Sequence, residues 1–428
     1  MFQRLSRFAK TGMLSAMALL LVAPIASWSG SRAAAAAKPV EITYDGKKLA
    51  LEVQPQWVKG RLLVPYASVV AALGGKTQWD AKTKTVTATK GSAKIVYSVG
   101  TVSATKNGEK LTLDTAPVVV GGRTFVPLRF TAESFGLWVK WNASSNQVQL
   151  FSSRTVQTKT GSLKLKARPD RIVTLSSSDT EIVAALGGHL VGRSTALGKV
   201  YPPSAASLPE VGSAHGIDFE KLASLKPDLV IGSPALQQNA ATVEKLGAQM
   251  LLNSQNTFAE IQSTIRLYGE VLGKEDEAAK LIKDMDARLQ GLKKPAKAPK
   301  ALILYGAPGD FVVALPTSYP GNFLELAGGA NVAAKFPNMD KMPQYAEFSM
   351  ERIVAADPDV IYLITHGDPD EVKASFKKEL QSNPVWKNLG AVKSDQFEVL
   401  PNDLFAANPG LRAPEAIEYL NGLLLQAK

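Results

Sequence analysis

The sequence predicts an α/β protein of two similar lobes joined by a long backbone helix, preceded by a small repeated α+β domain. Three observations support this fold class. One α/β motif occurs twice in the second half of the 428-residue chain, another motif occurs twice in residues 40–152, and a Pro-free helical pattern separates the copies of the first motif. Alternating helices and apolar strands are typical of parallel sheets, and a duplicated unit indicates two lobes.

The duplicated α/β motif combines a short helix, a Pro-Asp turn and an apolar strand. Its copies run over residues 215–232 and 349–366. His215 precedes the helix of the first copy, and His366 follows the strand of the second. Because the loops of paired lobes meet across a cleft, we expect both imidazoles to face that cleft. Two imidazoles so placed suit iron, above all the iron of a haem.

The α/β domain is expected over residues 169–428. Within it we predict an N lobe over 169–256, a linking helix over 257–292 and a C lobe over 299–428. The linking segment has apolar positions at helical spacing, which indicates one long helix or two helices close together. Residues 153–168 are polar and basic, and they are predicted to be a linker or, alternatively, a first edge strand.

The N-terminus has the pattern of a secretory signal peptide over residues 1–37. Arg4, Arg7 and Lys10 precede an apolar stretch over 13–25, and small residues follow. An uncleaved membrane anchor is the alternative, although the apolar stretch is shorter than the ~20 residues that span a bilayer. We therefore expect an exported protein at the outer face of the envelope or in the cell wall.

The composition excludes several classes of site. The chain has no Cys, so it has no disulfide, zinc–thiolate site, cysteine nucleophile or lipidated N-terminal cysteine. The formal charge is +11, but no basic block is interleaved with aromatic residues, which disfavours nucleic-acid binding. No Ser/His/Asp spacing, metal-hydrolase motif or phosphate loop is present, so we do not expect an enzyme.

Residues 38–152 contain an internal repeat with an offset of 62 residues. The segment 60–65 (Gly-Arg-Leu-Leu-Val-Pro) recurs at 122–127, and Trp79-Asp80 recurs as Trp141-Asn142. These motifs resemble the stalk-type domain named for the N-terminus of copper amine oxidases. The stretch has no His and therefore no imidazole ligand for copper. We expect a spacer or wall-contact module, with Trp79 and Trp141 in its core rather than serving as carbohydrate platforms.

The second domain resembles a known family of transport proteins. The segments 171–182, 225–231 and 326–331 are similar to the helix-backbone (class III) substrate-binding proteins, which serve ABC importers of ferric siderophores, haem and cobalamin. The resemblance covers about residues 168–426. Through residues 366–380 and 386–393 the chain is most similar to the haem receptors of Gram-positive iron uptake.

The resemblance implies a set of cargo ligands. It makes His366 an axial haem ligand, and it places His215 where those receptors typically have a methionine. Bis-imidazole ligation should lower the reduction potential of the iron relative to His/Met ligation. Tyr305 and Tyr319 are candidates for cargo contact in the cleft, with plain packing as the alternative, and His189 fits a surface turn.

The family also implies a docking surface for the membrane subunits of the importer. One surface Glu on each lobe contacts arginines there. Glu181 matches the first, whereas the second aligns with Asn322, which is uncharged, and Glu325 lies one turn later. A helix-dipole role in the first turn is the alternative for Glu181.

The leading hypothesis is a secreted receptor that captures haem and delivers it to an ABC importer. A ferric-siderophore or corrinoid receptor of the same class is the first alternative, and a wall-associated structural or adhesion protein is the second. Imidazole coordinates iron only when it is neutral, and its ordinary pKa is ~6.5. Haem binding is therefore expected to weaken toward pH 5.

Overall fold

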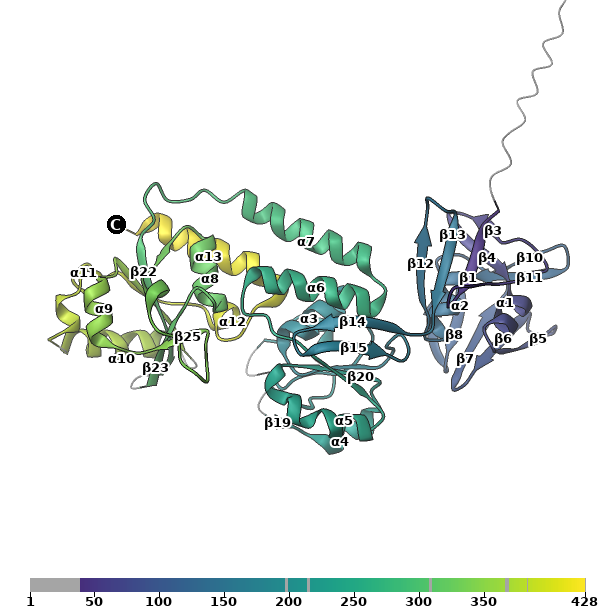
Figure 1. Cartoon of the computed structure of the whole chain (residues 1–428), viewed down its shortest axis with the longest axis horizontal. Helices are drawn as coiled ribbons and strands as arrows, with labels where there is room; N and C mark the ends of the chain where they lie inside the picture. Colours follow the sequence, from purple (N-terminus) through teal and green to yellow (C-terminus); the bar gives the residue numbers. More distant parts are fainter. Residues whose placement is uncertain are drawn as a thin grey trace, which may run out of the picture. The chain divides into compact units, whose positions relative to one another are not determined.

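The computed structural model describes residues 39–196, 199–213, 216–307, 310–365, 369–382 and 384–427 (Figure 1). Residues Val40–Lys428 form one compact unit that contains the repeat domain and the α/β domain. The predicted signal peptide lies outside the described residues, as do His215 and His366. Within the described ranges, no helix is long and apolar enough to cross a bilayer.

The repeat domain, residues 39–152, is called the stalk below. It contains three small sheets, with strand orders β12-β13-β1-β2, β10-β11-β4-β3 and β5-β6-β7-β8-β9. Its elements are β1 (Glu41–Tyr44), β2 (Lys47–Lys48), β3 (Gln56–Val58), β4 (Arg61–Pro65), α1 (Tyr66–Ala72), β5 (Lys76–Asp80), β6 (Thr85–Lys90), β7 (Ala93–Ser98), β8 (Ser103–Lys106), β9 (Glu109–Thr112), β10 (Val118–Val120), β11 (Arg123–Pro127), α2 (Leu128–Ser134), β12 (Trp138–Asn142) and β13 (Gln147–Phe151).

The sequence repeat corresponds to a structural repeat. The succession β4, α1, β5, β6 recurs as β11, α2, β12, β13. Pro65 and Pro127 precede α1 and α2 with φ of −61° and −60°, the angle that the proline ring imposes. Both halves contribute to one hydrophobic core, which includes Val64 and Val126 from the paired strands β4 and β11. The predicted α+β domain of two similar halves is therefore present.

The Trp-Asp and Trp-Asn pairs specify turns. Asp80 Oδ1 accepts hydrogen bonds from the backbone N–H groups two and three residues later, at 2.8 and 3.2 Å. Asn142 Oδ1 accepts the equivalent bonds at 3.1 and 3.3 Å. Such side-chain turns reverse the chain between β5 and β6 and between β12 and β13. The acidic or amide residue of each motif is thus explained by local geometry.

The tryptophans of these pairs are not in the core, and the prediction that they would be is wrong. Trp79 is 45% exposed and Trp141 is 36% exposed. The reason is their position, because β5 and β12 are the outer strands of their sheets. Trp141 packs edge-on against Trp57, with ring centroids 5.5 Å apart.

Residues 153–168 do not form the predicted linker. They contain a β-hairpin of β14 (Arg154–Thr158) and β15 (Gly161–Leu165), which pair only with each other. Val156 and Leu165 are 1% exposed and lie in the same core as the helix α6 (Phe258–Leu272). Alternating apolar residues give the hairpin one face to bury. The segment therefore belongs to the core of the α/β domain.

The N lobe has a four-stranded parallel sheet in the order β17-β16-β20-β21. Helices lie on both sides of it, and a small hairpin follows β17 (Figure 1). Its elements are β16 (Ile172–Thr174), α3 (Ser177–Ala185), β17 (Leu190–Gly192), β18 (Gly212–Ser213), β19 (Gly216–Ile217), α4 (Phe219–Leu225), β20 (Leu229–Gly232), α5 (Ala240–Lys245) and β21 (Gln249–Leu252).

The segment that links the lobes forms two helices. Of the two predictions, one long helix or two helices close together, the second is confirmed. These are α6 and α7 (Glu275–Gln290). Gly273 ends α6 with φ +66°, a left-handed conformation that suits glycine. The helices fold back on each other, since Gln262 Nε2 donates to Asp286 Oδ1 at 2.6 Å. A Cβ on Gly269 would lie 2.6 Å from the Cβ of Ala278, so glycine permits this close packing.

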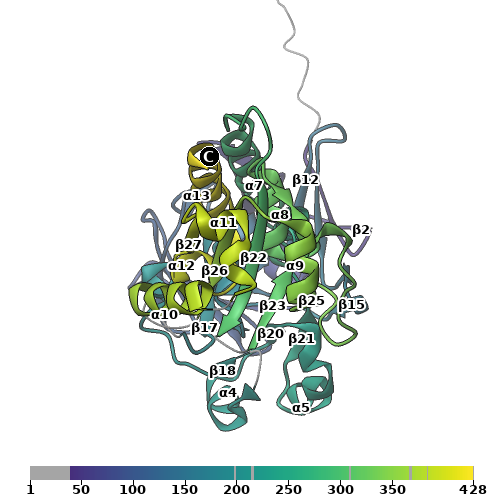
Figure 2. The same cartoon turned by 90° about the vertical axis from the view of Figure 1, so that its left-hand side faces the viewer.

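The C lobe has a six-stranded sheet in the order β25-β23-β22-β26-β27, with β24 paired to β22. Helices α8 and α13 pack against each other beside this sheet (Figure 2). The elements are β22 (Lys300–Ala307), β23 (Asp310–Ala314), α8 (Tyr319–Leu326), β24 (Ala330–Asn331), β25 (Tyr345–Glu347), α9 (Met350–Ala356), β26 (Val360–Ile364), α10 (Pro369–Ser382), α11 (Gly390–Lys393), β27 (Phe397–Val399), α12 (Asn402–Phe405) and α13 (Ala413–Gln426).

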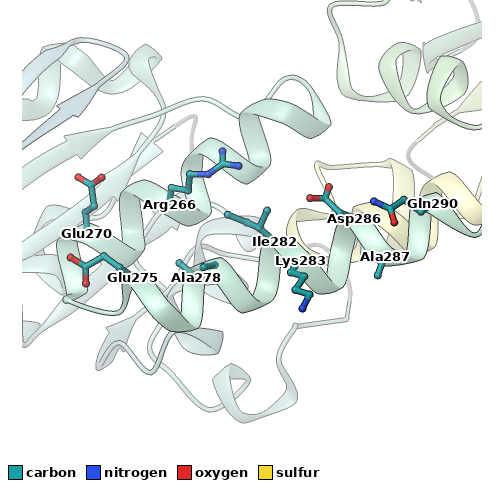
Figure 3. A pocket seen from close by; sticks show the side chains of 10 residues that line it. Arg266, Glu270, Glu275, Ala278, Ile282, Lys283, Asp286, Ala287 and Gln290 are labelled. Carbon is teal, nitrogen blue, oxygen red and sulfur yellow. The ribbon is translucent and has the colours of Figure 1, made fainter. Parts of the chain in front are cut away.

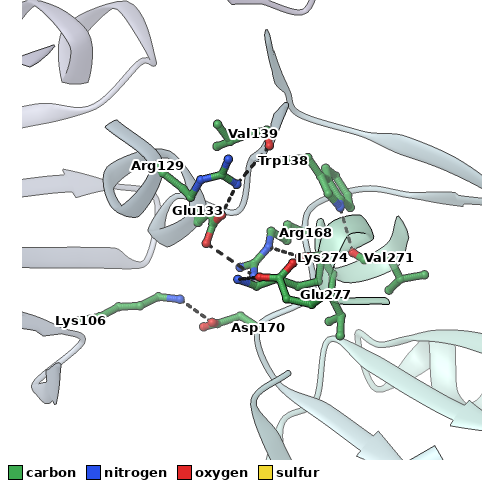
Figure 4. Close-up of polar contacts among 11 residues, drawn as sticks. Lys106, Arg129, Glu133, Trp138, Val139, Arg168, Asp170, Val271, Lys274 and Glu277 are labelled. Carbon is green, nitrogen blue, oxygen red and sulfur yellow. Dashed lines mark hydrogen bonds and ion pairs between the residues drawn. The ribbon is translucent and has the colours of Figure 1, made fainter. Parts of the chain in front are cut away.

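The stalk contacts the C-terminal end of α6 through one buried tryptophan (Figure 4). Trp138 begins β12 in the stalk, yet it is 2% exposed within the core of the α/β domain. Its Nε1 donates to Val271 O at 2.9 Å, and Arg168 Nε donates to Leu272 O at 2.8 Å. The last carbonyls of a helix have no partner within the helix, so these two bonds satisfy orphan acceptors.

Ion pairs surround this contact. Arg168 lies 3.7 Å from Glu133 of the stalk, and Lys106 of the stalk lies 2.5 Å from Asp170. Arg168 N also donates to Gly136 O at 2.8 Å. The contact thus combines a shared core, backbone hydrogen bonds and paired charges. The stalk is docked on the N lobe instead of hanging from a flexible tether.

We predict that Trp138→Ala lowers the free energy of unfolding by about 3–5 kcal/mol, the usual cost of deleting a buried tryptophan. Trp138→Phe keeps most of the volume but leaves Val271 O without its donor, which costs about 1–3 kcal/mol. Urea unfolding monitored by circular dichroism measures both values.

The matched control is Trp79→Ala, which removes the same side chain from an exposed position of the stalk. Its expected cost is below about 1 kcal/mol. Equal losses for the two alanine variants would contradict the proposed role of Trp138.

Candidate functional site

The parallel sheet of the N lobe brings four strand ends to one edge. β16, β17, β20 and β21 all run in the same direction, so the loops after them converge. Ser176, two residues after β16, caps α3 by accepting a hydrogen bond from Asp179 N. Ligands of open α/β sheets bind at this carboxyl edge, which makes it the first half of the candidate site.

A buried arginine organises the loop that follows β17. Arg193 is 6% exposed and forms an ion pair with Glu210 at 2.8 Å. Its guanidinium also donates to Ser194 O at 2.9 Å and to Ala205 O at 3.0 Å. Because a buried cation requires partners for its charge and its N–H groups, these bonds hold the start and the end of the loop together.

The hairpin of β18 and β19 is fixed to this loop. Thr195 N donates to Gly212 O at 2.7 Å. Gly212 has φ +103°, and a Cβ there would lie 2.1 Å from Gly216 O, so only glycine fits. His215 belongs to the two residues between β18 and β19, outside the described residues. The described flanks therefore anchor the chain on both sides of His215 at the carboxyl edge of the N-lobe sheet.

The C lobe has an equivalent edge. β22, β26 and β27 are parallel, and Tyr305 of β22 pairs with Ile364 at the end of β26. Thr365 follows and is 2% exposed. His366 is the next residue, outside the described residues, and α10 begins at Pro369. The sheet therefore brings Tyr305 to the strand end that precedes His366, a proximity that their separation in the sequence conceals.

Two predicted cargo residues use their hydroxyl groups for the fold. Tyr305 Oη donates to Ala406 O at 3.0 Å, and Tyr319 Oη donates to Phe405 O at 2.6 Å. Burial raises the pKa of both phenols, that of Tyr319 well above its ordinary value. Both hydroxyl groups are therefore committed to backbone carbonyls of the segment around residue 405. Cargo contact through their rings stays a prediction.

Contacts between the lobes form a seam beside the two edges. Asn408 Nδ2 donates to Gln255 O, and Phe258 N donates to Asn322 Oδ1 at 2.9 Å. The guanidinium of Arg412 lies over the ring of Tyr201, 4.1 Å from its centroid. Sequence reasoning missed this cation–π pair, since nothing in the sequence brings residues 201 and 412 together.

A buried carboxyl group supports the N-lobe side of the seam. Asp179 is 4% exposed, and its oxygens accept hydrogen bonds from Ser176 Oγ, Tyr268 Oη and Gln255 Nε2 at 2.5, 2.6 and 2.6 Å. Burial raises the pKa of Asp179. The Ser-rich helix start predicts a capping role for this segment, but its connection to α6 through Tyr268 appears only in three dimensions.

The predicted importer contacts lie in different surroundings. Glu181 is half-buried on α3, where it accepts a hydrogen bond from the backbone N–H of Leu411. Burial raises its pKa to about 7, although the charge of Arg412 opposes the shift. Asn322 is committed to the bond with Phe258, and Glu325 is exposed on α8. Their roles in docking stay predictions.

A groove of about 600 Å³ lies between α6 and α7, away from both strand edges (Figure 3). Its polar lining mixes acidic and basic groups, namely Arg266, Glu270, Glu275, Lys283 and Asp286. No aromatic side chain lines it. A flat apolar ligand gains most of its binding free energy from apolar contact, so this groove does not suit one.

We predict that the stability of the protein falls as pH rises from 5 to 8 through Glu181. The raised pKa means that the folded state favours the neutral acid. Its contribution is complete below the ordinary pKa of 4.5 and is lost as pH passes through about 7. Glu181→Gln keeps the neutral form and should stabilise the protein by roughly 2 kcal/mol at pH 8, with little effect at pH 5.

Urea unfolding at pH 5 and pH 8 measures this difference. Glu244→Gln, an exposed position on α5, provides the control and should leave the pH dependence unchanged. An unchanged pH dependence in the Glu181 variant as well would rule out the assigned protonation state.

Comparison with known proteins relates both domains to families. Residues 43–150 match the family model described as the copper amine oxidase N-terminal domain. The α/β domain is similar to the high-affinity heme uptake system protein IsdE of Staphylococcus aureus, with 28% identity over 263 residues, 60% of this chain and 88% of the relative.

Solved structures give the same relationship. A substrate-binding protein of an ABC transporter from Listeria monocytogenes aligns with a TM-score of 0.54 at 31% identity, over 60% of this chain and 99% of the other. IsdE of S. aureus in complex with heme aligns with a TM-score of 0.53 at 28% identity, over 60% and 98%. The heme-binding protein RhuT of Roseiflexus aligns with a TM-score of 0.51 at 25% identity, over 60% and 98%.

The match that covers most of the chain is to the model for periplasmic binding proteins, over residues 172–404. This range includes the sheets of both lobes, the linking helices and the bond between Phe258 and Asn322. It is more than half of the chain, which therefore belongs to the periplasmic binding protein family.

Proposed function

We propose that this protein is the exported receptor of an ABC importer, that it captures haem between its lobes, and that it delivers the haem for iron uptake. The observation that carries the proposal is the position of the two histidines in the chain. In the N lobe, β18 and β19 flank the two residues that include His215, and in the C lobe, Thr365 after β26 directly precedes His366. The heme-binding relatives IsdE and RhuT support this choice of cargo.

Haem has the chemistry that such a site requires. It is a flat apolar disc whose iron accepts a ligand on each face, and its two carboxylates favour solvent. Enclosing the disc between lobes removes apolar area from water, which contributes ~25 cal/mol per Å². A ligand from each lobe then selects an iron porphyrin over an apolar ring without metal. Two imidazoles would favour the ferric state relative to His/Met ligation.

The described scaffold keeps the two edges at a fixed spacing. Helices α6 and α7 pack closely at Gly269 and Ala278, Asn408 bonds directly from the C lobe to Gln255 of the N lobe, and Asn322 bonds to Phe258 at the start of α6. Large hinge motion would break these contacts. Capture therefore proceeds by small adjustments of the loops at the edges, a behaviour suited to a rigid disc. The protein acts by binding and release and catalyses no reaction.

We predict that titration with haemin produces an intense Soret band, and that His215→Ala and His366→Ala each change its position. Each substitution removes one iron ligand and should weaken haem binding at least about tenfold, which corresponds to 1.4 kcal/mol. Protonation of imidazole should also weaken binding by the native protein between pH 7 and pH 5. Absorption titrations at both pH values measure these effects.

The third histidine supplies the matched control. His189 is exposed in the turn after α3, so His189→Ala should leave the spectrum and the affinity unchanged. Native spectra for both the His215 and the His366 variants would exclude axial ligation. The absence of any Soret band, with tight binding of a ferric siderophore or a corrinoid, would reassign the cargo within the same family.

We further propose that Glu181 and Glu325 contact arginines of the importer membrane subunits. An approaching arginine would lower the pKa of Glu181 and ionise it at neutral pH. Exposed ion pairs contribute about 0–1 kcal/mol, so Glu181→Gln and Glu325→Gln should each weaken docking by less than about fivefold. Binding to the reconstituted membrane subunits, measured by surface plasmon resonance, gives the values.

Asn322 provides the opposite test of this surface. Asn322→Asp keeps an oxygen for Phe258 N–H and adds the charge that this position lacks. It should strengthen docking by a similar factor. Unaltered docking in all three variants would exclude this surface as the importer contact, with haem affinity serving as the control for folding.

We also propose that the stalk retains the receptor in the cell wall. The chain has no cysteine for a lipid anchor, and the stalk is docked on the N lobe through Trp138. A stalk held by wall polymer would keep the haem site at the cell surface. This role would also explain why the receptor carries a domain with no evident chemistry of its own.

A further inference from the structure

The positive charge of the folded chain belongs to the stalk alone. Residues 39–152 contain 14 Lys and Arg against 7 Asp and Glu, whereas residues 153–428 contain 30 against 31. The stalk therefore has a formal charge of +7 and the remainder −1. Charge distributed so unevenly directs one part of a protein toward anionic partners.

The five-stranded sheet of the stalk has one face in the core and one in solvent. Val86, Ala88, Ile95 and Tyr97 on β6 and β7 are fully buried. The residues between them point to the opposite side, since neighbours along a strand alternate. That outer face, here called the Lys-Thr face, consists of the outward residues of β5–β9. It is the surface on which the proposal rests.

Cross-strand register places lysines and hydroxyl groups in rows on the Lys-Thr face. Lys76, Thr89 and Lys94 are opposite one another on β5, β6 and β7. Thr87, Thr105 and Lys110 belong to the next row, with Val96 between the two threonines. Hydroxyl groups donate and accept hydrogen bonds, and ammonium groups attract anions. Such rows offer an extended polymer repeated contacts.

The lysines of the Lys-Thr face are not neutralised by the protein. The stalk ion pairs among the described residues involve Lys48, Arg61, Lys106, Arg123 and Arg129, and none involves Lys76, Lys94 or Lys110. All three side chains are exposed. Asp80, at the corner of the same face, already accepts two backbone hydrogen bonds from its own turn.

The spacing of these lysines indicates a chain with many charges. Strand separation of ~4.8 Å places Lys76 and Lys94 about 10 Å apart, and Lys94 and Lys110 about 12 Å apart. These are spacings of the Cα atoms, and Lys76 and Lys110 lie at opposite edges of the sheet, so a single phosphate group does not span all three lysines. A flexible polymer with a phosphate on every repeat unit does reach all three, and its polyol hydroxyls match the threonines.

We propose that the Lys-Thr face binds the polyol-phosphate polymer of a Gram-positive cell wall. The proposal rests on the exported location in the proposed function and names the surface and the ligand for retention in the wall. A membrane fits less well, since Val96 is the one apolar side chain in the rows described above. Nucleic acid also fits less well, because these rows contain no aromatic ring for stacking on bases.

The test measures binding of the full exported chain to purified Gram-positive cell-wall sacculi. Sacculi stripped of their polyol-phosphate polymer by hydrofluoric acid serve as the comparison. We expect binding to intact sacculi, at least about tenfold weaker binding to stripped sacculi, and weakening by salt. Equal binding to both would overturn the proposal in favour of peptidoglycan, and tighter binding to phosphatidylglycerol vesicles or duplex DNA would identify another partner.

The decisive variant combines Lys76→Gln, Lys94→Gln and Lys110→Gln. The matched control combines Lys245→Gln, Lys280→Gln and Lys387→Gln, which removes the same charge from exposed positions of the α/β domain. We expect at least tenfold weaker wall binding for the stalk variant alone, and a salt dependence whose logarithmic slope is smaller by about two. If wall binding weakened equally in both variants, net charge alone would explain the loss, and the Lys-Thr face would be excluded as the binding site.

Haem binding, measured on the same two variants by the Soret band, separates this inference from the proposed function. Both variants should bind haem as the native chain does, which also confirms that they are folded. Wall binding without haem binding would leave the Lys-Thr face intact and refute the receptor assignment. Haem binding with unaltered wall binding by the stalk variant would refute the Lys-Thr face alone.

Discussion

The arrangement of the domains depends on the contact between the Trp138 indole and the end of α6. There the stalk, the β14–β15 hairpin and the N lobe share one core, and the indole N–H satisfies a carbonyl that the helix leaves unpaired. After α6, the chain turns at Gly273 and enters α7, and α7 leads to the C lobe. A single buried side chain therefore connects the module proposed to hold the wall with the element that links the lobes. Without it, the ion pairs, the bonds of Arg168 and the packing of Phe151 would remain as attachments of the stalk.

Much of this architecture was accessible from sequence, and the reasons are local. Local signals specify helix starts at Pro65 and Pro127 and turns at the Trp-Asp and Trp-Asn pairs. The sequence repeat therefore predicts the structural repeat. The Pro-Asp turns likewise marked helix–strand units. Where the prediction failed, the deciding fact was tertiary. Trp79 and Trp141 are exposed because their strands are outermost, and residues 153–168 are ordered because α6 covers Val156.

The residues of the candidate site could be proposed from the sequence, but their surroundings could not. Sequence alone proposed the two histidines, and the fold describes β18 and β19 around His215 and the end of β26 before His366. It did not reveal that the hydroxyls of Tyr305 and Tyr319 are already occupied by backbone carbonyls, nor that Glu181 is half-buried beside Leu411 and Arg412. These facts depend on pairs of residues about 90 to 230 positions apart, which no local pattern records. For that reason, a possible iron ligand could be proposed from the residue type, whereas hydrogen-bond partners and shifted pKa values, which depend on neighbours in space, could not be predicted.

The close packing at Gly269 has a consequence for how such receptors diversify. The backbone at this position lies so near Ala278 that one added methyl group has no room. Any larger residue would require α6 and α7 to move apart or Ala278 to change with it. Variation at residue 269 is therefore expected only together with a compensating change in α7, so the turn of the helix pair constrains which sequences keep the two lobes joined in this way.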